Sequence, residues 1–148
     1  MRKTVFLSST GADLSAYRAQ VIEDLRGHDW FRLDAMEEWG ARSRPPMHLC
    51  RERVAESDIF VGLIGHYRGW EPDGDEGQRS ITEMEYDWAV DGNKPRLMFV
   101  APDSFAGAAP ASGGDAKARQ QAFRTRLMKA ETVDQRCFGS APRSLPPC

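Results

Sequence analysis

Short apolar runs alternate along this chain with longer stretches of helical period. The runs at 4–7, 30–36, 58–65 and 95–100 predict four strands, because they are short, apolar and bounded by turn residues. Apolar positions three or four residues apart predict helices over about 13–26, 47–57, 80–92 and 116–130. A fifth strand is predicted to start at 132–134.

The run at 58–65 is apolar without interruption, which is typical of a strand buried on both faces of a parallel sheet. Strands that alternate with helices join through right-handed crossovers. We therefore expect an α/β domain with a flavodoxin-like, three-layer α/β/α fold and a parallel sheet of about five strands, in the order 2-1-3-4-5. One domain is expected over 1–138, followed by an irregular tail over 139–148.

Unusual residues gather where the predicted strands end. Ligands of open parallel sheets bind beyond the carboxyl ends of the strands, at the point where the strand order reverses. The residues at these ends are Ser8 and Ser9 after the first strand, Trp39 after the second, and Gly65, His66, Arg68 and Trp70 after the third. The loop over 66–79 is long, polar and rich in aromatic residues, so we regard it as a functional candidate.

The helix over 80–92 contains two glutamates with different predicted positions. Ser80 and Glu83 have the spacing of a capping box, which gives Glu83 a structural task at the helix start. At about 100° per residue, Glu85 lies within the apolar stripe of the helix and Glu83 points roughly the opposite way. A carboxylate in an apolar stripe is costly unless something uses it, and its burial would suit acid–base chemistry. Alternatively, Glu85 pairs with Arg68 or a nearby backbone group.

Each of the other candidates has a functional and a structural interpretation. The two serines after the first strand suit phosphate binding at a helix start, or they serve as turn and cap residues. His66 is either a base or ligand contact, or a satisfied polar residue at a strand end. Arg68 binds an anion or pairs with an acidic residue. Trp39 and Trp70 either stack on a base or nicotinamide ring, or cover an edge of the core.

Composition narrows the classes of partner. The formal net charge is −2, which argues against a general binder of nucleic acid or of anionic membranes. The three cysteines are odd in number and widely spaced, so neither a disulfide framework nor a metal site is expected. No signal peptide is visible and no stretch approaches the roughly 20 apolar residues that span a bilayer, so we expect a cytoplasmic protein.

Several segments together resemble a known family. They are Val5–Thr10, Asp13–Leu14, Ser57–Gly65, Tyr67–Trp70, Ser80–Tyr86 and Lys94–Pro95. In this order they resemble the TIR-like "domain of unknown function 4062" family, which is similar to TIR domains and to nucleoside deoxyribosyltransferases. The resemblance implies a place in larger proteins with NTPase or helical-repeat modules, in bacterial defence-type and animal signalling architectures.

The resemblance also implies an activity and a catalytic residue. In enzymatic members of these groups, a helix glutamate with a small residue four positions later assists cleavage of an N-glycosidic bond. Glu85 followed by Ala89 fits that spacing and Glu83 does not, which agrees with the choice made from helix position. The resemblance implies NAD or a related nucleotide as the substrate and no required cofactor. Thr82, in a matching segment, joins the ligand-binding candidates.

Three functions stay open at the level of sequence. In the first, Glu85 binds the ribose hydroxyls of NAD and stabilises an oxocarbenium-like transition state. In the second, the domain is a binding module for self-association or partner docking, with contacts around Trp39 and Tyr67. In the third, it is a nucleotide sensor that binds without cleaving.

Overall fold

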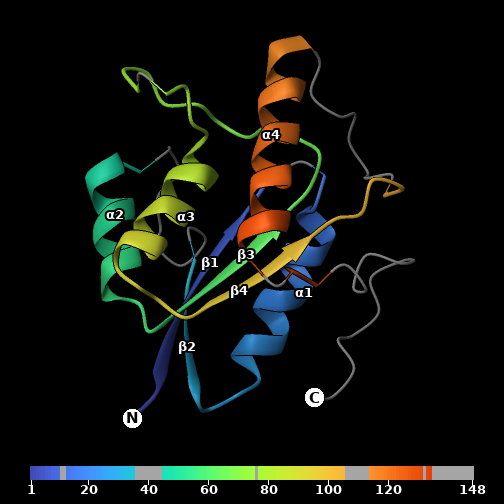
Figure 1. The fold of residues 1–148 in the computed structure, drawn as a ribbon. Helices are drawn as coiled ribbons and strands as arrows, with labels where there is room; N and C mark the ends of the chain where they lie inside the picture. The colour runs from blue at the N-terminus through green and yellow to red at the C-terminus, as the bar shows by residue number, and fades with distance from the viewer. Residues whose placement is uncertain (11–12, 36–44, 76, 106–113, 132, 135–148) are drawn as a thin grey trace.

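The computed structural model of the chain describes residues 1–10, 13–35, 45–75, 77–105, 114–131 and 133–134 (Figure 1). Its strands are β1 (Lys3–Ser9), β2 (Phe31–Asp34), β3 (Ile59–Ile64), β4 (Arg96–Val100) and β5 (Val133–Asp134). Its helices are α1 (Ser15–Arg26), α2 (Met47–Glu56), α3 (Ile81–Asp91) and α4 (Gly114–Ala130). The predicted helices and the first four predicted strands are therefore present, with bounds close to those expected.

The strands form a parallel sheet in the order β2-β1-β3-β4, with β5 paired beside β4. The order reverses at β1, since the chain pairs β2 on one side of it and β3 on the other. This confirms the α/β class and the first four places of the predicted order. A full fifth strand and a complete three-layer arrangement stay predictions, because β5 has two residues and α1 alone covers one face in the described part of the chain.

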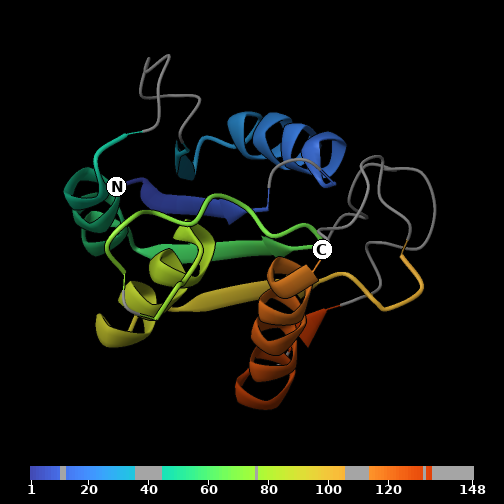
Figure 2. The ribbon, with the colours of Figure 1, turned by 90° about the horizontal axis from the view of Figure 1, so that it is seen from above.

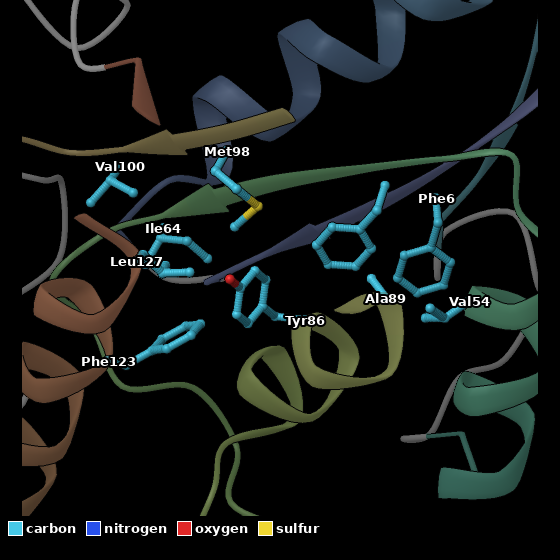
Figure 3. Close-up of a cluster of buried hydrophobic side chains, with 10 residues drawn as sticks. Phe6, Val54, Ile64, Tyr86, Ala89, Met98, Val100, Phe123 and Leu127 are labelled. Carbon is cyan, nitrogen blue, oxygen red and sulfur yellow. The ribbon is translucent and has the colours of Figure 1, made fainter. Parts of the chain in front are cut away.

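Alternate strand residues feed two hydrophobic clusters, one on each face of the sheet. The α3-side cluster joins the sheet to α2, α3 and α4 (Figure 3) and consists of Phe6, Val54, Phe60, Ile64, Tyr86, Ala89, Met98, Val100, Phe123 and Leu127. The α1-side cluster consists of Val5, Leu7, Leu14, Ile22, Ala35, Val61, Leu63 and Ala101. Figures 1 and 2 show the same division, with α1 apart from the other three helices.

Helix α3 begins as predicted, at a serine cap. Ser80 Oγ accepts a hydrogen bond from the Glu83 backbone N–H at 3.2 Å. The reciprocal half of the predicted capping box is wrong, because the Glu83 carboxylate accepts a hydrogen bond from Arg68 instead. Glu83 thus stabilises a loop contact rather than the backbone of its own helix.

The buried face of α3 is wider than the predicted inward stripe of Ile81, Met84 and Trp88, and it is turned away from that stripe, since Ile81 is only half-buried. Met84 and Ala89 are buried as expected for an inward face, but Thr82 and Tyr86 are buried as well. Trp88 is only half-buried and packs against the edge of the α3-side cluster. The reason is that α3 contacts both the sheet and α2, so a larger arc of the helix is covered than one neighbour would cover.

Two further predictions concern the ends and the surroundings of the domain. The predicted tail over 139–148 lies outside the described residues. Within the part of the chain that the structure describes, no helix is both long enough and apolar enough to cross a bilayer.

Candidate functional site

Glu85 of α3 is a carboxyl group inside the fold, with 4% of its surface exposed. Burial raises the pKa of this carboxyl from 4.5 to about 7, while the Ser8 hydroxyl and the charge of Arg18 act in the opposite direction. The alternative pairing of Glu85 with Arg68 is not observed, because Arg68 is not among the groups that shift the pKa of Glu85 and it bonds to Glu71 and Glu83 instead. Near neutral pH, Glu85 is therefore divided between its neutral and its charged form.

Ser8 is the buried hydroxyl beside Glu85. It lies at the carboxyl end of β1, is 2% exposed, and its Oγ makes no hydrogen bond of standard geometry among the described residues. The hydroxyl still lies close enough to lower the pKa of Glu85, so the two side chains approach each other without a well-aligned bond. A buried hydroxyl without a partner costs about 1–3 kcal/mol, and a polar group of a ligand would remove that cost.

Cys50 of α2 lies on the same side of the sheet as Glu85. Burial and the nearby Glu85 charge raise the pKa of its thiol to about 11. Cys50 is therefore a buried, protonated thiol, which is a poor nucleophile.

Sequence reasoning missed Arg18 of α1. Its Nη1 donates to Ser9 Oγ at 2.9 Å and, more weakly, to the Leu7 carbonyl oxygen at 3.4 Å. Ser9 therefore supports an arginine at the end of β1, and its use as a ligand contact stays a prediction. The signal was an arginine one position after Tyr17, a member of the apolar stripe of α1. We call Ser8, Arg18, Cys50 and Glu85 the Glu85 site.

Asp13, also missed as a site residue, joins the loops that follow β1 and β3. Its Oδ1 accepts a hydrogen bond from Thr10 Oγ1 at 3.1 Å, and its Oδ2 accepts from the backbone N–H groups of His66 at 2.7 Å and Tyr67 at 3.1 Å. A Cβ atom at position 65 would lie 2.1 Å from Asp13 Oδ2. Gly65 is thus explained by the close approach of this carboxylate, and its contact with a ligand stays a prediction.

The His66 ring links the ends of β3 and β4. Its Nε2 donates to the Pro102 carbonyl oxygen at 3.0 Å, and the ring stacks on Phe105 with centroids 6.5 Å apart. The satisfied-residue interpretation of His66 agrees with these contacts. A role as base or ligand contact stays a prediction.

Arg68 clamps the β3–α3 loop onto two helices. It is 4% exposed and donates to Glu71 at 2.9 Å, to Glu83, to the Gln78 carbonyl oxygen at 3.0 Å and to Gln120 Oε1 at 3.5 Å. Gln78 has a left-handed φ of 51°, which the clamp helps to hold. The acid-paired interpretation of Arg68 is therefore observed, and anion binding by Arg68 stays a prediction.

The remaining predicted residues lie at different depths. Thr82 is buried on α3. Trp70 is half-buried, and its carbonyl oxygen accepts a hydrogen bond from the Ile81 backbone N–H at 2.8 Å, which fixes the loop to the start of α3. Trp39 lies outside the described residues. Of the predicted site residues, the structure thus brings Ser8 and Glu85 together, and it places Arg68 in a separate network.

A family comparison covers almost the same part of the chain as the sheet and its helices. Residues 4–138 match the family described as "Domain of unknown function (DUF4062)". The chain belongs to the DUF4062 family. The Glu85 site and the network around Asp13 both lie inside the part of the DUF4062 domain that matches.

Other comparisons with this DUF4062 domain are distant. One similar solved structure is described as "A unique GCN5-related glucosamine N-acetyltransferase region exist in the fungal multi-domain GH3 beta-N-acetylglucosaminidase". It is 10% identical, with a TM-score of 0.39, and the match covers 91% of this chain and 16% of that chain. A TM-score this low supports no inference. No curated protein matches the chain.

The chemistry available to the DUF4062 domain follows from its carboxyl groups. Within the described residues, no group of three or more His, Cys, Asp and Glu residues is placed to hold a metal ion. Glu85 can exchange a proton near pH 7, and in its charged form it can stabilise a positive charge in surroundings from which water is largely excluded.

Proposed function

We propose that this DUF4062 domain is a TIR-like effector or signalling domain that cleaves the N-glycosidic bond of NAD or a related nucleotide. The proposal includes the flavodoxin-like, three-layer fold of such domains, with β5 as the start of the fifth strand, and a cytoplasmic role in bacterial defence-type signalling. The observation that carries it is Glu85, a buried carboxyl with a pKa of about 7 that lies beside the buried Ser8 hydroxyl. Ser8 Oγ makes no hydrogen bond of standard geometry among the described residues.

Cleavage between nicotinamide and ribose requires stabilisation of a cation more than it requires an acid. The bond from C1′ to the ring nitrogen breaks, and its electron pair discharges the pyridinium ring, so nicotinamide leaves neutral. The ribose becomes oxocarbenium-like, water adds at C1′, and the proton of that water passes to solvent. An ionised Glu85 stabilises the cation electrostatically and accepts hydrogen bonds from the ribose hydroxyls.

The pKa of Glu85 suits this task because the substrate itself favours the charged form. A positive charge within about 4–6 Å lowers the pKa of a carboxyl group, and the nicotinamide ring of NAD carries such a charge. Glu85 starts from a pKa of about 7, so a modest further effect ionises it at neutral pH. The Ser8 hydroxyl can then donate to the carboxylate or bond to the ribose.

The position of the Glu85 site also supports a nucleotide ligand. Ser8 lies at the carboxyl end of β1, where the order of the sheet reverses, and nucleotides bind open parallel sheets at such points. Positioning of the ligand is assigned to the predicted contacts, which are Ser8, Ser9, Trp39, Gly65, His66, Arg68, Trp70 and Thr82.

The test compares NAD loss and nicotinamide release by the wild type and by Glu85→Gln, at high protein concentration. We expect Glu85→Gln to lower the rate by at least about 100-fold, the size of effect seen when one stabilising group is removed from a transition state. Glu52→Gln is the matched control, because it removes the same charge from an exposed position on α2. Equal rates for wild type and Glu85→Gln would contradict the role of Glu85.

The alternative functions are distinct outcomes of the same experiment. Absence of turnover in the assembled protein, with NAD or ADP-ribose binding seen in calorimetry, indicates a nucleotide sensor. Absence of both turnover and binding indicates an assembly module, whose partners are a second copy or the NTPase or repeat modules of a larger protein.

A further inference from the structure

Gly65, the first residue beyond β3, is held by side chains from distant parts of the chain. The register of β3 with β1 ends at Leu63, and its register with β4 ends at Ile64. The N–H of Gly65 donates to Thr10 Oγ1 at 3.0 Å, and its carbonyl oxygen accepts from Gln120 Nε2 at 2.8 Å. Both backbone polar groups of Gly65 are therefore bonded to side chains rather than to a neighbouring strand.

Gln120 is a buried amide on the inner face of α4. It is 1% exposed, and Phe123 and Leu127 follow it at spacings of three and four residues on the same face. Both of these neighbours belong to the α3-side cluster, so an apolar side chain at 120 would extend that cluster without desolvating an amide. What glutamine adds at this position is the hydrogen bonding of its side chain.

The amide of Gln120 joins two parts of the β3–α3 loop. Its Nε2 donates to the Gly65 carbonyl oxygen, and its Oε1 accepts more weakly from Arg68 Nη1 at 3.5 Å. The residue before it, Arg119, donates to both carboxylate oxygens of Glu71 in the same loop, at 2.9 and 3.0 Å. Two adjacent residues of α4 therefore fix the loop at three points, and Figure 1 shows the loop running past this helix.

The partners of Gln120 belong to the proposed ligand site. Gly65 and Arg68 are two of the residues to which the positioning of the nucleotide is assigned, and His66 lies between them in the chain. A binding segment that is already ordered gives higher affinity, because the ligand does not have to supply the free energy of ordering it. Gln120 therefore acts where such ordering would matter for binding.

We propose that Gln120 is a positioning residue for substrate binding: it holds the segment over 65–68 in the conformation that contacts the nucleotide. This inference rests on the proposed function, because that function assigns ligand contacts to the segment. Without the Gln120 amide, the ligand itself has to order the segment. The loss therefore weakens binding and leaves the bond-breaking step at Glu85 unchanged.

The first measurement is amide hydrogen exchange in Gln120→Met, which keeps the length of the side chain and removes both hydrogen-bonding groups. We expect faster exchange of the amides over 65–67 and unchanged exchange in the middle of β3. Gln121→Met is the matched control, since it makes the same substitution at an exposed neighbour whose amide oxygen accepts from Arg124. Exchange over 65–67 that is as slow as in the wild type would overturn the role of Gln120.

The second measurement separates binding from chemistry. We expect Gln120→Met to raise KM for NAD and to weaken ADP-ribose binding in calorimetry, each by about fivefold, the effect of one neutral hydrogen bond. The value of kcat should change by less than about twofold, and Gln121→Met should leave KM unchanged. A role in stability alone would lower the urea midpoint without changing KM or the ADP-ribose affinity, which would overturn the proposal. Gln120→Glu, which keeps the acceptor for Arg68 and removes the donor for Gly65, replaces Gln120→Met if that variant does not fold.

The outcomes separate this inference from the function on which it rests. Unchanged KM and affinity in a folded Gln120 variant, with NAD cleaved by the wild type, overturn the role of Gln120 and leave the proposed function in place. Weaker ADP-ribose binding by Gln120→Met, with no NAD cleavage by any variant including the wild type, supports the inference and contradicts cleavage. A wild type that neither cleaves NAD nor binds ADP-ribose contradicts both.

Discussion

Glu85 links the stability of the domain to pH. Its pKa is about 7 in the folded chain against 4.5 as the ordinary value, so the folded state holds this proton over a pH range in which the unfolded state has lost it. The free energy of unfolding therefore falls as pH rises from about 4.5 through 7, by about 3 kcal/mol for this one group. Ionised Glu85 therefore lowers the free energy of unfolding at neutral pH.

Replacing this carboxyl should remove that cost. We predict that Glu85→Gln raises the free energy of unfolding relative to wild type by about 2.5 kcal/mol more at pH 8 than at pH 5, because only the charged form is penalised by burial. Urea unfolding of both proteins at the two pH values measures the difference. For Glu52→Gln, an exposed control, the difference from wild type should be the same at both pH values. A pH-independent effect of Glu85→Gln would show that burial does not perturb Glu85.

The two effects predicted for Glu85→Gln have opposite signs, higher stability and lower activity. If Glu85 stabilised the fold, its replacement would lower the free energy of unfolding. If Glu85 is a functional group that destabilises the fold, its replacement raises the free energy of unfolding. The pattern therefore distinguishes a functional Glu85 from a structural one without a ligand-bound structure.

Some residues of the candidate site could be predicted from the sequence and others could not. Glu85 could be chosen from its place in the helix, because helical period determines which residues share a face. Arg18 and Asp13 could not, because their partners lie in other elements: Ser9 in β1 for Arg18, and the His66 and Tyr67 backbone for Asp13. Such contacts depend on which strand ends meet in the folded chain. The spacing of residues within one element does not reveal this.

At the scale of elements, the ends of β1 and β3 are joined through Asp13 and Gly65. The Asp13 carboxylate is fixed by three donors, so it cannot yield to a new atom without losing hydrogen bonds. We predict that Gly65→Ala lowers the free energy of unfolding by about 1–3 kcal/mol, since its Cβ would lie 2.1 Å from Asp13 Oδ2. Urea unfolding measures the loss.

Gly69 offers a matched control four residues later. A Cβ at Gly69 would meet no atom within 4 Å, so Gly69→Ala should change the free energy of unfolding by less than about 0.5 kcal/mol. Amide NMR shifts should move at His66 and Tyr67 in Gly65→Ala and stay in place in Gly69→Ala. Equal destabilisation by both substitutions would mean that the contact with Asp13 does not decide the cost.

The roles of the residues in the β3–α3 loop could not be predicted from the sequence. Its length predicted a functional loop, and the structure reveals a framework of ion pairs inside it. Arg79 bonds to Asp75 at 3.1 Å and to Asp87 of α3 at 3.0 Å, which raises the pKa of the guanidinium further, and Arg68 forms the second clamp. Composition alone could not separate these uses, because arginines that bind ligands and arginines that pair with acids occur in similar loops.

For the whole molecule, the order of the main strands could be predicted because alternating strands and helices permit few topologies. The uninterrupted apolar run of β3 correctly indicated a central strand, which lies between β1 and β4. The extent of a fifth strand could not be derived in the same way, since 132–134 is too short to define a period. The width of the buried face of α3 could not be predicted either, because it depends on how α2 and the sheet both pack against that helix.

The two hydrophobic clusters are built from alternate residues of the same strands, so neither can be lost alone. Phe6 lies between Val5 and Leu7 in β1, and both of these neighbours belong to the opposite cluster. We predict that Leu14→Ala on the α1 side and Leu127→Ala on the α3 side each lower the free energy of unfolding by about 2–5 kcal/mol, since both side chains are fully buried. Each variant should still unfold in one transition.

This cooperativity is tested by whether two spectroscopic signals change at the same urea concentration. Far-UV circular dichroism reports all helices, and tryptophan fluorescence includes Trp88, which packs against the α3-side cluster. If the two faces of the sheet unfolded independently, Leu127→Ala would move the fluorescence transition to lower urea concentration and leave most of the dichroism transition unchanged. A shared sheet requires both signals to move together, with an unchanged dependence on urea. Val90→Ala, at an exposed position of α3, should shift neither signal by more than about 0.5 kcal/mol, so a split seen only in Leu127→Ala would identify two separate folding units.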